Sequence, residues 1–330
     1  MKNLKLLLPR YFSILENDLE AKYLISKKIP ADFSKSDSTK SLWKKHEYSI
    51  KNNEVGKSNV SSSLLDLKIE LATRIFRSCV FCEKRCKVDR NISSGQCNVR
   101  EARIYSEFLH MGEESFLIPS YTIFFSGCTF NCVFCQNWDI SQQICGLSIK
   151  HKDLIFLIDK RIKEGAKNIN WVGGDPTSNL LYILLVLKEC KANIVQVWNS
   201  NMYCSVETMK LLDGVIDIYL TDFKYGNDFC AKRLSKIDNY TGIIKRNHKL
   251  AYDFGEVVIR HLIMPNHLDC CSVKILDWIS KNLDDAVVNL MAQYRPQYEA
   301  YKFLDISKPL SIDDYYNLKN YAKKLGIYLI

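Results

Sequence analysis

Apolar segments rich in β-branched and aromatic residues alternate with segments of helical spacing from residue 121 to about residue 292. The apolar segments are residues 121–127, 168–173, 194–198, 216–221, 257–263 and 287–292, and the helical segments include 153–164, 180–191, 207–212 and 273–281. Strands that are separated by helices pair in parallel, because each helix carries the chain back to the start of the next strand. The alternation therefore predicts an α/β fold with a mostly parallel, six-stranded sheet. Its roughly 170 residues could curl into a partial barrel, since a full eight-unit barrel needs about 250.

The chain before this region differs in composition. Residues 1–75 mix short helical patterns with polar stretches at 34–39 and 57–59, which favour loops. Four cysteines follow, and then two short stretches at 102–105 and 115–118 predict small strands. We therefore expect three parts, which are an N-terminal helical extension at 1–75, a small cysteine-rich metal-binding module at 76–118, and the partial barrel at 119–330.

Charge and hydropathy exclude some classes of partner. The chain has 330 residues, a formal net charge of +9 and 47% hydrophobic residues, which suffice for a sizeable core. The N-terminal lysines form no compact basic motif with interleaved aromatic residues, so they indicate a solvated surface and not a nucleic-acid partner. No run of 18 apolar residues and no signal-peptide cleavage pattern is present. We expect a soluble, cytoplasmic protein with no membrane partner.

Cysteine usage points to metal binding. The chain has 13 cysteines, and a secreted disulfide framework would normally accompany a signal peptide and a shorter chain. Seven of the cysteines fall into two tight groups, so metal or iron–sulfur ligation explains them better. For the other six, the default expectation is that of buried small hydrophobic residues; they are Cys145, Cys190, Cys204, Cys230, Cys270 and Cys271.

The first group is a C-x3-C-x2-C motif directly after the first predicted barrel strand. We call Cys128, Cys132 and Cys135 the cysteine triad. Three thiolates on one short loop can bind three irons of a 4Fe–4S cubane and leave the fourth iron open to a non-protein ligand. The alternatives are a zinc site that lacks one ligand, or free buried cysteines. The spacing and the position after a strand favour the cubane, with its open iron as the catalytic position.

The second group has the spacing C-x2-C-x3-C-x10-C. We call Cys79, Cys82, Cys86 and Cys97 the upstream cysteines. Four soft ligands close together suit either a structural zinc ion or a fully ligated auxiliary iron–sulfur cluster, and spacing alone does not separate the two. An auxiliary cluster could transfer electrons or bind the substrate, whereas a zinc ion would only stabilise the fold of the module.

The cysteine triad and its position resemble the radical S-adenosylmethionine (SAM) superfamily. This resemblance implies a partial (β/α)6 TIM-like barrel in which SAM chelates the open iron of the 4Fe–4S cluster. It implies that one electron breaks the sulfonium C–S bond, and that the resulting 5′-deoxyadenosyl radical abstracts a hydrogen atom from a substrate. An electron donor such as flavodoxin or ferredoxin is the partner expected from this chemistry, and a protein substrate is a further candidate partner.

Several loops match SAM-binding positions of the superfamily. Gly173, Gly174 and Asp175 resemble its Gly-Gly-Glu-Pro segment, which meets the SAM amino group, with Asp175 in place of the usual Glu. In isolation the glycines would suggest only a turn at a strand end. Phe134 matches an aromatic position whose backbone contacts adenine, although simple packing of the loop explains it equally well.

The remaining matches lie on later strands. Ser200 and Asn201 follow the third strand, and Asp222 and Lys224 follow the fourth. The resemblance implies that such residues bind the ribose and the methionine carboxylate; taken singly, each would more often be a solvated loop residue. Alternation along the fifth strand sends Arg260 and His261 to opposite faces, so at most one points into the barrel, and we favour His261 as the SAM contact.

Over residues 79–300 the chain resembles a group of uncharacterised homologues of pyruvate formate-lyase activating enzyme. The segments that carry this resemblance are 125–128, 135–137, 172–176, 198–203, 222–226 and 293–296, together with the upstream cysteines. It implies an activating-enzyme-like oxidoreductase, in which case the substrate would be a glycyl radical enzyme. The position of the extra cysteines, upstream of the triad, weakens this assignment. The alternatives are a radical SAM enzyme that modifies a small molecule or another protein side chain, and a non-catalytic iron–sulfur or zinc module.

Overall fold

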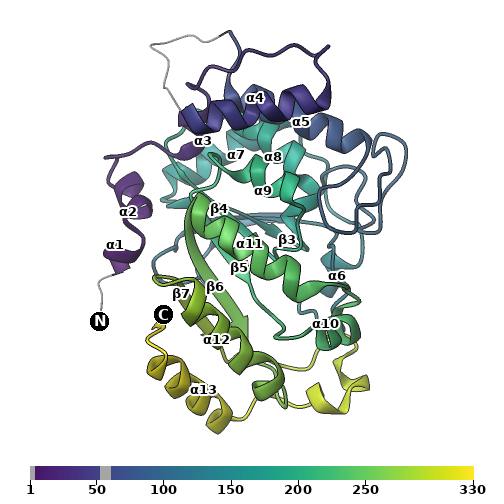
Figure 1. The fold of residues 1–330 in the computed structure, drawn as a ribbon, viewed down its shortest axis with the longest axis vertical. Coiled ribbons are helices and arrows are strands. Elements are labelled where there is room, and N and C mark those ends of the chain that lie inside the picture. The colour runs from purple at the N-terminus through teal and green to yellow at the C-terminus, as the bar shows by residue number, and fades with distance from the viewer. Residues whose placement is uncertain (1–3, 53–60) are drawn as a thin grey trace.

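A computed structural model describes residues 4–52 and 61–330, and in this part of the chain eight strands form one sheet in the order β1 to β8 (Figure 1). The polar stretch 57–59 lies outside the described residues. The strands are β1 (Ile104–His110), β2 (Ser120–Phe125), β3 (Asn168–Gly173), β4 (Val195–Ser200), β5 (Ile218–Asp222), β6 (Glu256–Leu262), β7 (Val287–Met291) and β8 (Tyr328–Leu329).

Helices connect successive strands and precede the sheet. They are α1 (Leu4–Leu7), α2 (Pro9–Leu15), α3 (Lys22–Ser26), α4 (Thr39–Asn52), α5 (Leu64–Arg77), α6 (Trp138–Ser141), α7 (His151–Lys163), α8 (Leu180–Glu189), α9 (Val206–Leu212), α10 (Asp228–Ser235), α11 (Tyr240–Phe254), α12 (Val273–Asn282) and α13 (Ile312–Lys324). Short 3-10 turns lie at Pro176–Asn179, Ala300–Lys302 and Leu304–Ile306, and one π-helical turn at Leu268–Ser272. In the described residues, no helix combines the length and the apolar character that a membrane crossing requires.

The predicted α/β partial barrel is confirmed. The six predicted apolar segments form β2 to β7, and all neighbours from β2 to β8 pair in parallel. β1 pairs antiparallel with β2 and forms one edge of the sheet. Because parallel strands point the same way, the loops that follow them gather at one end of the barrel, where the chemistry of such folds is placed.

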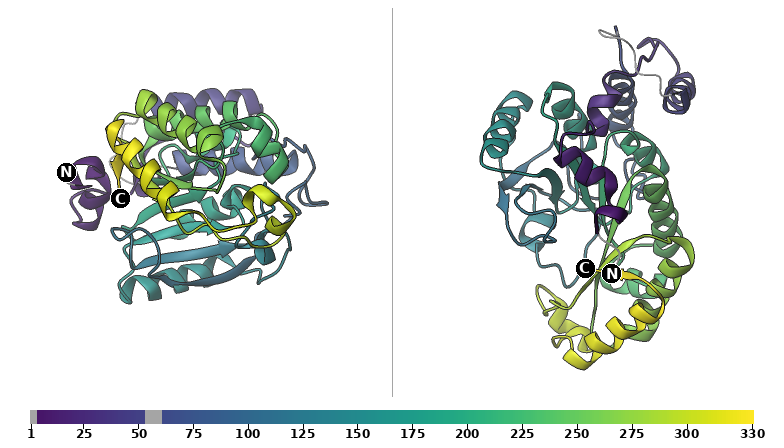
Figure 2. Two further views of the ribbon diagram at one scale, coloured as in Figure 1. Left: turned by 90° about the horizontal axis from the view of Figure 1, so that it is seen from below. Right: turned by 90° about the vertical axis from the view of Figure 1, so that its left-hand side faces the viewer.

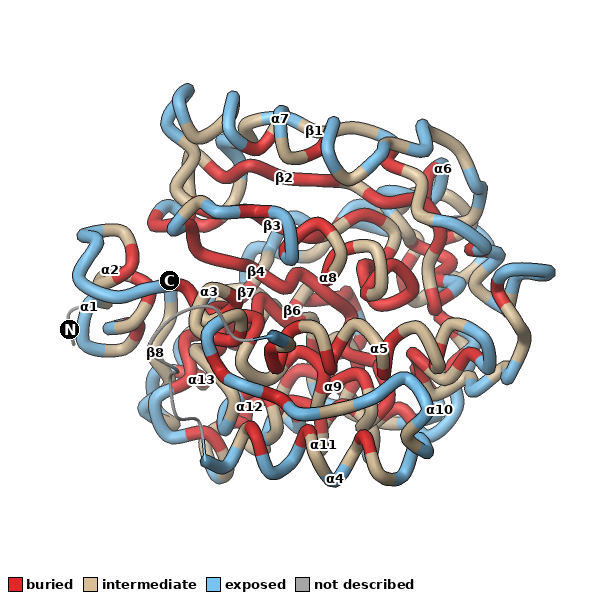
Figure 3. The backbone as a smooth tube through the Cα atoms, turned by 90° about the horizontal axis from the view of Figure 1, so that it is seen from above, coloured by how far each residue is buried: buried red, intermediate tan, exposed pale blue. Residues whose placement is uncertain are grey.

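Side chains alternate between a polar interior and an apolar outer layer. Phe125 of β2 points outward and meets Tyr182 of α8 edge-on, with ring centroids 6.1 Å apart. Asn170 of β3 points inward, and its Nδ2 donates to Glu113 at 3.0 Å. Strands β2 to β7 are buried along most of their length, whereas helices expose their outer faces (Figure 3). The barrel interior thus offers polar groups beneath the strand ends.

The strand predicted at 115–118 is wrong. This stretch forms a turn, in which Leu117 N donates to the Glu114 carbonyl at 2.8 Å. Its apolar side chains pack against the N-terminal segment instead of pairing in a sheet, with the rings of Phe116 and Tyr11 5.4 Å apart. The strand predicted at 102–105 corresponds to β1, which begins at Ile104 and extends to His110.

The first N-terminal helices, α1 to α3, lie against the end of the barrel at which its strands begin. Tyr11 N donates to Glu256 at the start of β6 at 2.9 Å, and Arg10 Nε lies 3.2 Å from Asp217 just before β5. Helix α5 begins at a capping box between Ser63 and Asp66 and packs against α8. Figure 2 shows α1 and α2, in purple, beside the C-terminal end of the chain in both views, and β8 there pairs with the start of β7. The opposite end, where the strands finish, is left for ligands.

Candidate active site

A cavity of about 430 Å³ opens where the barrel strands end. Its volume falls within the range of pockets that hold small ligands, about 300–1,000 Å³. Ten of the residues expected at the site line this cavity: Cys128, Cys132, Phe134, Cys135, Gly173, Gly174, Ser200, Asn201, Asp222 and Lys224. These residues come from the loops after β2, β3, β4 and β5, so the topology unites residues nearly 100 positions apart.

The loop that carries the cysteine triad is anchored to the end of α10. Asn131 N donates to Ser235 O at 3.1 Å and Val133 N donates to Leu234 O at 2.9 Å. The Ser235 hydroxyl also donates to Cys132 Sγ, at 2.9 Å. A short loop held in this way directs its thiols into one cavity.

The donor set of the triad fits an iron–sulfur cluster. Burial raises the pKa of Cys132 to about 12 and that of Cys128 well above its ordinary value, since a buried thiolate needs a nearby positive charge. Iron would supply that charge. Phe130 N already donates to Cys128 Sγ at 3.3 Å, and the Ser141 hydroxyl lies 3.2 Å from Cys135 Sγ. Three thiolates would hold a cubane and leave one iron open.

The two glycines after β3 are required by the protein's own backbone. Gly173 has φ +131, and a Cβ there would lie 2.1 Å from the carbonyl oxygen of Phe125. A Cβ on Gly174 would lie 2.1 Å from the carbonyl oxygen of Gly127. The end of β3 therefore packs directly on the start of the cysteine loop, and this contact explains the glycines without a ligand.

Asp175 does not line the cavity but lies behind it, 1% exposed. Its carboxylate accepts hydrogen bonds from Thr177 N at 2.9 Å, from the Ser200 hydroxyl at 3.0 Å and from Asn201 N at 3.1 Å. Burial raises its pKa, and these hydrogen bonds oppose the rise. The shorter Asp in place of Glu thus braces the loop after β4 instead of reaching a ligand directly.

Asp222 and Lys224 place a charged pair on the cavity wall. Lys224 Nζ lies 2.6 Å from Asp222 Oδ2. Burial opposes the lysine charge, but the Asp222 carboxylate and the nearby Cys132 thiol raise the pKa of Lys224 above its ordinary value. A cation held in this way can meet a carboxylate of a bound ligand, while Asp222 can accept from a hydroxyl. The Phe134 ring packs beside Tyr225 and Tyr294, with centroids 6.4 and 6.0 Å apart.

The structure corrects the expectation for the fifth barrel strand, β6, because Arg260 faces the cavity and His261 does not. His261 points outward, with Nδ1 2.7 Å from the carbonyl oxygen of Phe223 and Nε2 2.8 Å from the hydroxyl of Ser272. Burial lowers the pKa of His261 to about 4, so this imidazole is a neutral packing residue. Alternation along the strand sends only Arg260 inward.

Arg260 belongs to an ionic group that sequence reasoning missed. Its Nη2 contacts Glu113, and its Nε and Nη2 donate to the two oxygens of Glu114 at 2.8 and 2.6 Å. Glu113 and His110 line the cavity beside it. Both glutamates lie in the irregular segment before β2, where no motif or spacing marks them.

The upstream cysteines gather around a second, smaller cavity beside the first. Cys79, Cys82, Cys86 and Cys97 line it together with Thr129, the residue that follows Cys128. The module also touches the triad loop, since a Cβ on Gly127 would lie 3.0 Å from the carbonyl oxygen of Cys97. Four thiols around one cavity suit a metal or an iron–sulfur cluster adjacent to the triad.

Three of the six remaining cysteines also come together, which the default expectation of isolated buried thiols did not foresee. Cys230, Cys270 and Cys271 lie around His267, with all four ligand atoms within 4.8 Å of one another. We call these four residues the downstream cluster. The sequence did contain one signal of this cluster, which is the adjacent cysteine pair at 270–271, three residues after His267. Cys230 stands 40 positions before Cys270, and only the fold brings it to the cluster.

Comparisons with known protein sequences found a matching family model and a similar protein. A model of the Radical SAM superfamily matches residues 122–279. A protein of Methanocaldococcus jannaschii named Uncharacterized protein MJ0674 is 48% identical over 336 residues, covering 98% of this chain and 99% of that protein.

Solved structures with a similar chain trace include two radical SAM proteins. Streptococcus suis SuiB bound to S-adenosylmethionine has 15% identity and a TM-score of 0.46, covering 62% of this chain and 47% of SuiB. Methylornithine synthase (PylB) has 12% identity and a TM-score of 0.46, covering 97% of this chain and 77% of PylB. At these identities and TM-scores, the two structures bear on neither substrate nor chemistry here.

The assignment rests on the motif, its place after β2 and the family match. A 4Fe–4S cluster and SAM are the cofactors that the family uses, and the triad and its cavity fit them. The chain contains a radical SAM superfamily domain, matched at residues 122–279.

Proposed function

We propose that this protein reductively cleaves SAM at a 4Fe–4S cluster held by Cys128, Cys132 and Cys135, and that it thereby abstracts a hydrogen atom from a substrate. The observation that carries the proposal is that the three thiols face the same cavity as the Asp222–Lys224 pair. When bound, the cluster and SAM supply one-electron cleavage of the sulfonium C–S bond.

The protein's own residues bind and orient SAM in this proposal. Lys224 contacts the methionine carboxylate, and Asp222 accepts from a ribose hydroxyl. Ser200 and Asn201 line the same wall, held in place by hydrogen bonds to Asp175. The buried carboxylate thus acts as a positioning residue, because it fixes polar groups that face the ligand.

The upstream cysteines hold a second metal centre in this proposal, either an auxiliary iron–sulfur cluster or zinc. Their cavity shares Thr129 with the triad loop, so a redox-active cluster would lie next to the SAM cluster. Thr129 also accepts a hydrogen bond from Asn201 Nδ2 at 3.0 Å, which links both centres to the SAM-facing wall. Residues 76–118 form this module, residues 119–330 the catalytic barrel, and residues 1–75 an extension.

The substrate enters beside the polar wall formed by Arg260 and Glu113. A glycyl radical enzyme is one candidate, in which case the protein acts as an activating enzyme. A small molecule or another protein side chain is the alternative, and the charged wall suits a polar substrate. Reduced flavodoxin or ferredoxin in the cytoplasm supplies the electron.

The proposal is tested by purifying and reconstituting the full chain without oxygen, adding SAM and dithionite, and quantifying 5′-deoxyadenosine. The wild type is expected to produce it, and Cys132→Ala is expected to produce none. A Cys145→Ala variant is the matched control, because that thiol lies outside the triad and the upstream group. Absence of 5′-deoxyadenosine from wild type with a fully loaded cluster would overturn the proposal.

The activating-enzyme role is tested separately. Glycyl radical enzymes encoded in the same genome are mixed with the reconstituted protein, SAM and dithionite, and a glycyl radical is sought by electron paramagnetic resonance. The radical signal would support that role. Cleavage of SAM without any such signal would favour a small molecule or another side chain as substrate.

A further inference from the structure

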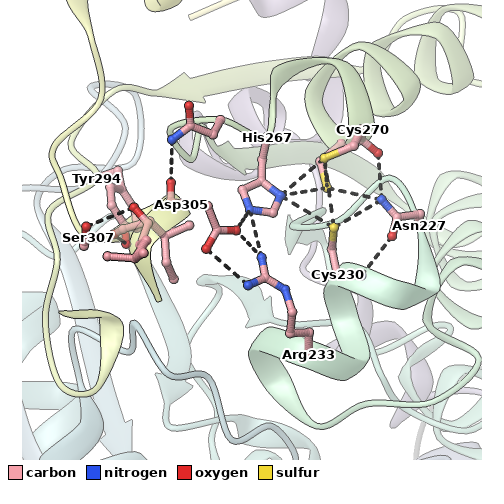
Figure 4. Close-up of polar contacts among 12 residues, drawn as sticks. Asn227, Cys230, Arg233, His267, Cys270, Tyr294, Asp305 and Ser307 are labelled. Atoms are coloured by element: carbon pink, nitrogen blue, oxygen red, sulfur yellow. Dashed lines mark hydrogen bonds and ion pairs between the residues drawn. The ribbon is translucent and has the colours of Figure 1, made fainter. Parts of the chain in front are cut away.

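The downstream cluster joins two segments of the chain, α10 and residues 267–271, which are more than 30 positions apart. Cys230 lies in the first turn of α10, His267 directly precedes the π-helical turn Leu268–Ser272, and Cys270 and Cys271 lie within that turn. Figure 4 shows His267 pointing its Nδ1 edge toward the sulfur atoms. Cys230 and His267 are each 4% exposed and Cys271 is fully buried. Three thiols and an imidazole thus converge in one site, in which three of the residues are buried and Cys270 is partly exposed.

The distances within the cluster are those of ligands around a single ion. The Cys270 sulfur lies 4.0 Å from that of Cys230 and 3.8 Å from that of Cys271. His267 Nδ1 lies 3.5 Å, 3.3 Å and 3.9 Å from the sulfurs of Cys230, Cys270 and Cys271. Tetrahedral zinc, with Zn–S about 2.3 Å and Zn–N about 2.0 Å, places two sulfurs about 3.8 Å apart and sulfur and nitrogen about 3.5 Å apart.

Neighbouring residues orient the ligands as metal sites require. His267 Nε2 lies 2.9 Å from Asp305 Oδ2, and that carboxylate is paired with Arg233. A carboxylate on Nε2 holds the proton there and leaves the Nδ1 lone pair directed at the ion. Asn227 Nδ2 lies 3.3 Å from Cys230 Sγ and 3.7 Å from Cys271 Sγ, so it can donate to both as thiolates.

We propose that Cys230, His267, Cys270 and Cys271 bind a structural zinc ion. A disulfide does not explain the arrangement, because it would use two thiols and leave the third thiol and the imidazole without a shared partner. A cubane does not explain it either, since its thiolates bind different irons and stand farther apart than ligands of one ion. A Cys3His set with four protein ligands is a closed zinc site, which is structural and not catalytic.

The zinc site would support the loop of the cysteine triad. Cys230 is near the start of α10, and Ser235 at the end of that helix donates to Cys132 Sγ. The ion ties this helix to the π-helical turn, and through His267 and Asp305 to the C-terminal segment (Figure 4). Zinc binding therefore cross-links these elements beside the SAM site. The ligands of this ion differ from the upstream cysteines and lie far from them in the sequence.

The test is the zinc and iron content of the anaerobically purified full chain, measured by inductively coupled plasma mass spectrometry. The proposal expects zinc to fall by one ion per chain in Cys230→Ser and in Cys271→Ser. Cys145→Ser is the matched control and should keep the wild-type content. Cys79→Ser/Cys86→Ser should also keep this ion, which separates it from any zinc at the upstream cysteines. Unchanged zinc in both downstream variants, or iron in place of zinc, would overturn the proposal.

X-ray absorption at the zinc edge covers the case in which a downstream variant fails to fold. The wild-type spectrum should contain a nitrogen ligand from His267 besides sulfur, which the all-cysteine upstream group cannot provide. His267→Cys should retain the ion and lose the nitrogen. An all-sulfur shell in the wild type, or a Cys230–Cys270 disulfide found by peptide mass spectrometry of anaerobic protein, would overturn the assignment. Zinc binding requires no SAM, so failure of SAM cleavage leaves this result unaffected.

Discussion

Replacing Glu114 by Gln tests the buried ionic group on the barrel's inner wall. Glu114 accepts two hydrogen bonds from Arg260, at 2.8 and 2.6 Å, and one from Asn289 at 2.9 Å. The side chains of Glu114 and Arg260 are only 3% and 13% exposed. Gln has the same shape but no charge, and its NH2 group would have to face one of these donors.

The expected loss follows from the burial of the pair. Breaking a buried ion pair lowers the free energy of unfolding by about 3–5 kcal/mol. Because Glu113 still contacts Arg260 in the variant, we expect a loss at the lower end, about 3 kcal/mol. This corresponds to a fall in the melting temperature of roughly 4 °C for a chain of 330 residues. Burial opposes the Glu114 charge, but Arg260 lowers the pKa of Glu114 below its ordinary 4.5. The stabilisation by this ion pair is therefore complete above pH 4.5, and it is lost as the pH falls through the pKa that Glu114 has in the folded protein.

The assay is urea unfolding of the anaerobic full chain, at pH 7 and at decreasing pH. The control is Glu107→Gln, which breaks a similar two-pronged pair with Arg161 on the surface, where the side chains are 17% and 20% exposed. That change should cost no more than about 1 kcal/mol. Equal losses in the two variants, or the same Glu114→Gln loss in an Arg260→Met background, would refute the reasoning.

Three further changes test other parts of the structure. Ser235→Ala removes the hydroxyl that donates to Cys132 Sγ at 2.9 Å, so the reduction potential of the SAM cluster should fall in an EPR-monitored titration; an unchanged potential would argue against this contact. Lys224→Met removes the cation on the cavity wall and should weaken SAM binding about tenfold in equilibrium dialysis, whereas unaltered affinity would rule out its carboxylate contact. Ser63→Ala removes a helix cap and should cost about 1 kcal/mol in urea unfolding while SAM cleavage stays at the wild-type level.

Local chemistry made the barrel and its cluster motif predictable from the sequence. Apolar runs with turn-forming ends identified β2 to β7, because burial on both faces of a parallel strand requires such runs. The spacing of the triad predicts an iron–sulfur cluster, since three thiolates on one loop restrict the ligand choices. Both signals lie within short stretches of chain.

The same reasoning missed what distant residues do together. The apolar residues at 115–118 are compatible with either a turn or a strand. Only their packing against the N-terminal segment decides in favour of the turn. Periodicity showed that Arg260 and His261 point to opposite faces, but not which face is the interior. The glutamates that pair with Arg260 lie in an irregular segment with no motif, so the sequence offered no indication of them.

The sequence by itself therefore determined the α/β barrel, and it predicted the triad as a cluster site with radical SAM chemistry, because each depends on patterns or spacings within a few consecutive residues. The tertiary structure alone decided that Asp175 braces a loop, that Arg260 faces the cavity, and that Cys230 meets His267 and the adjacent cysteine pair. The physical reason is that these arrangements depend on which loops the strand order brings together. A side chain's partners across 40 or more residues are set by folding of the whole barrel and not by its neighbours in the chain.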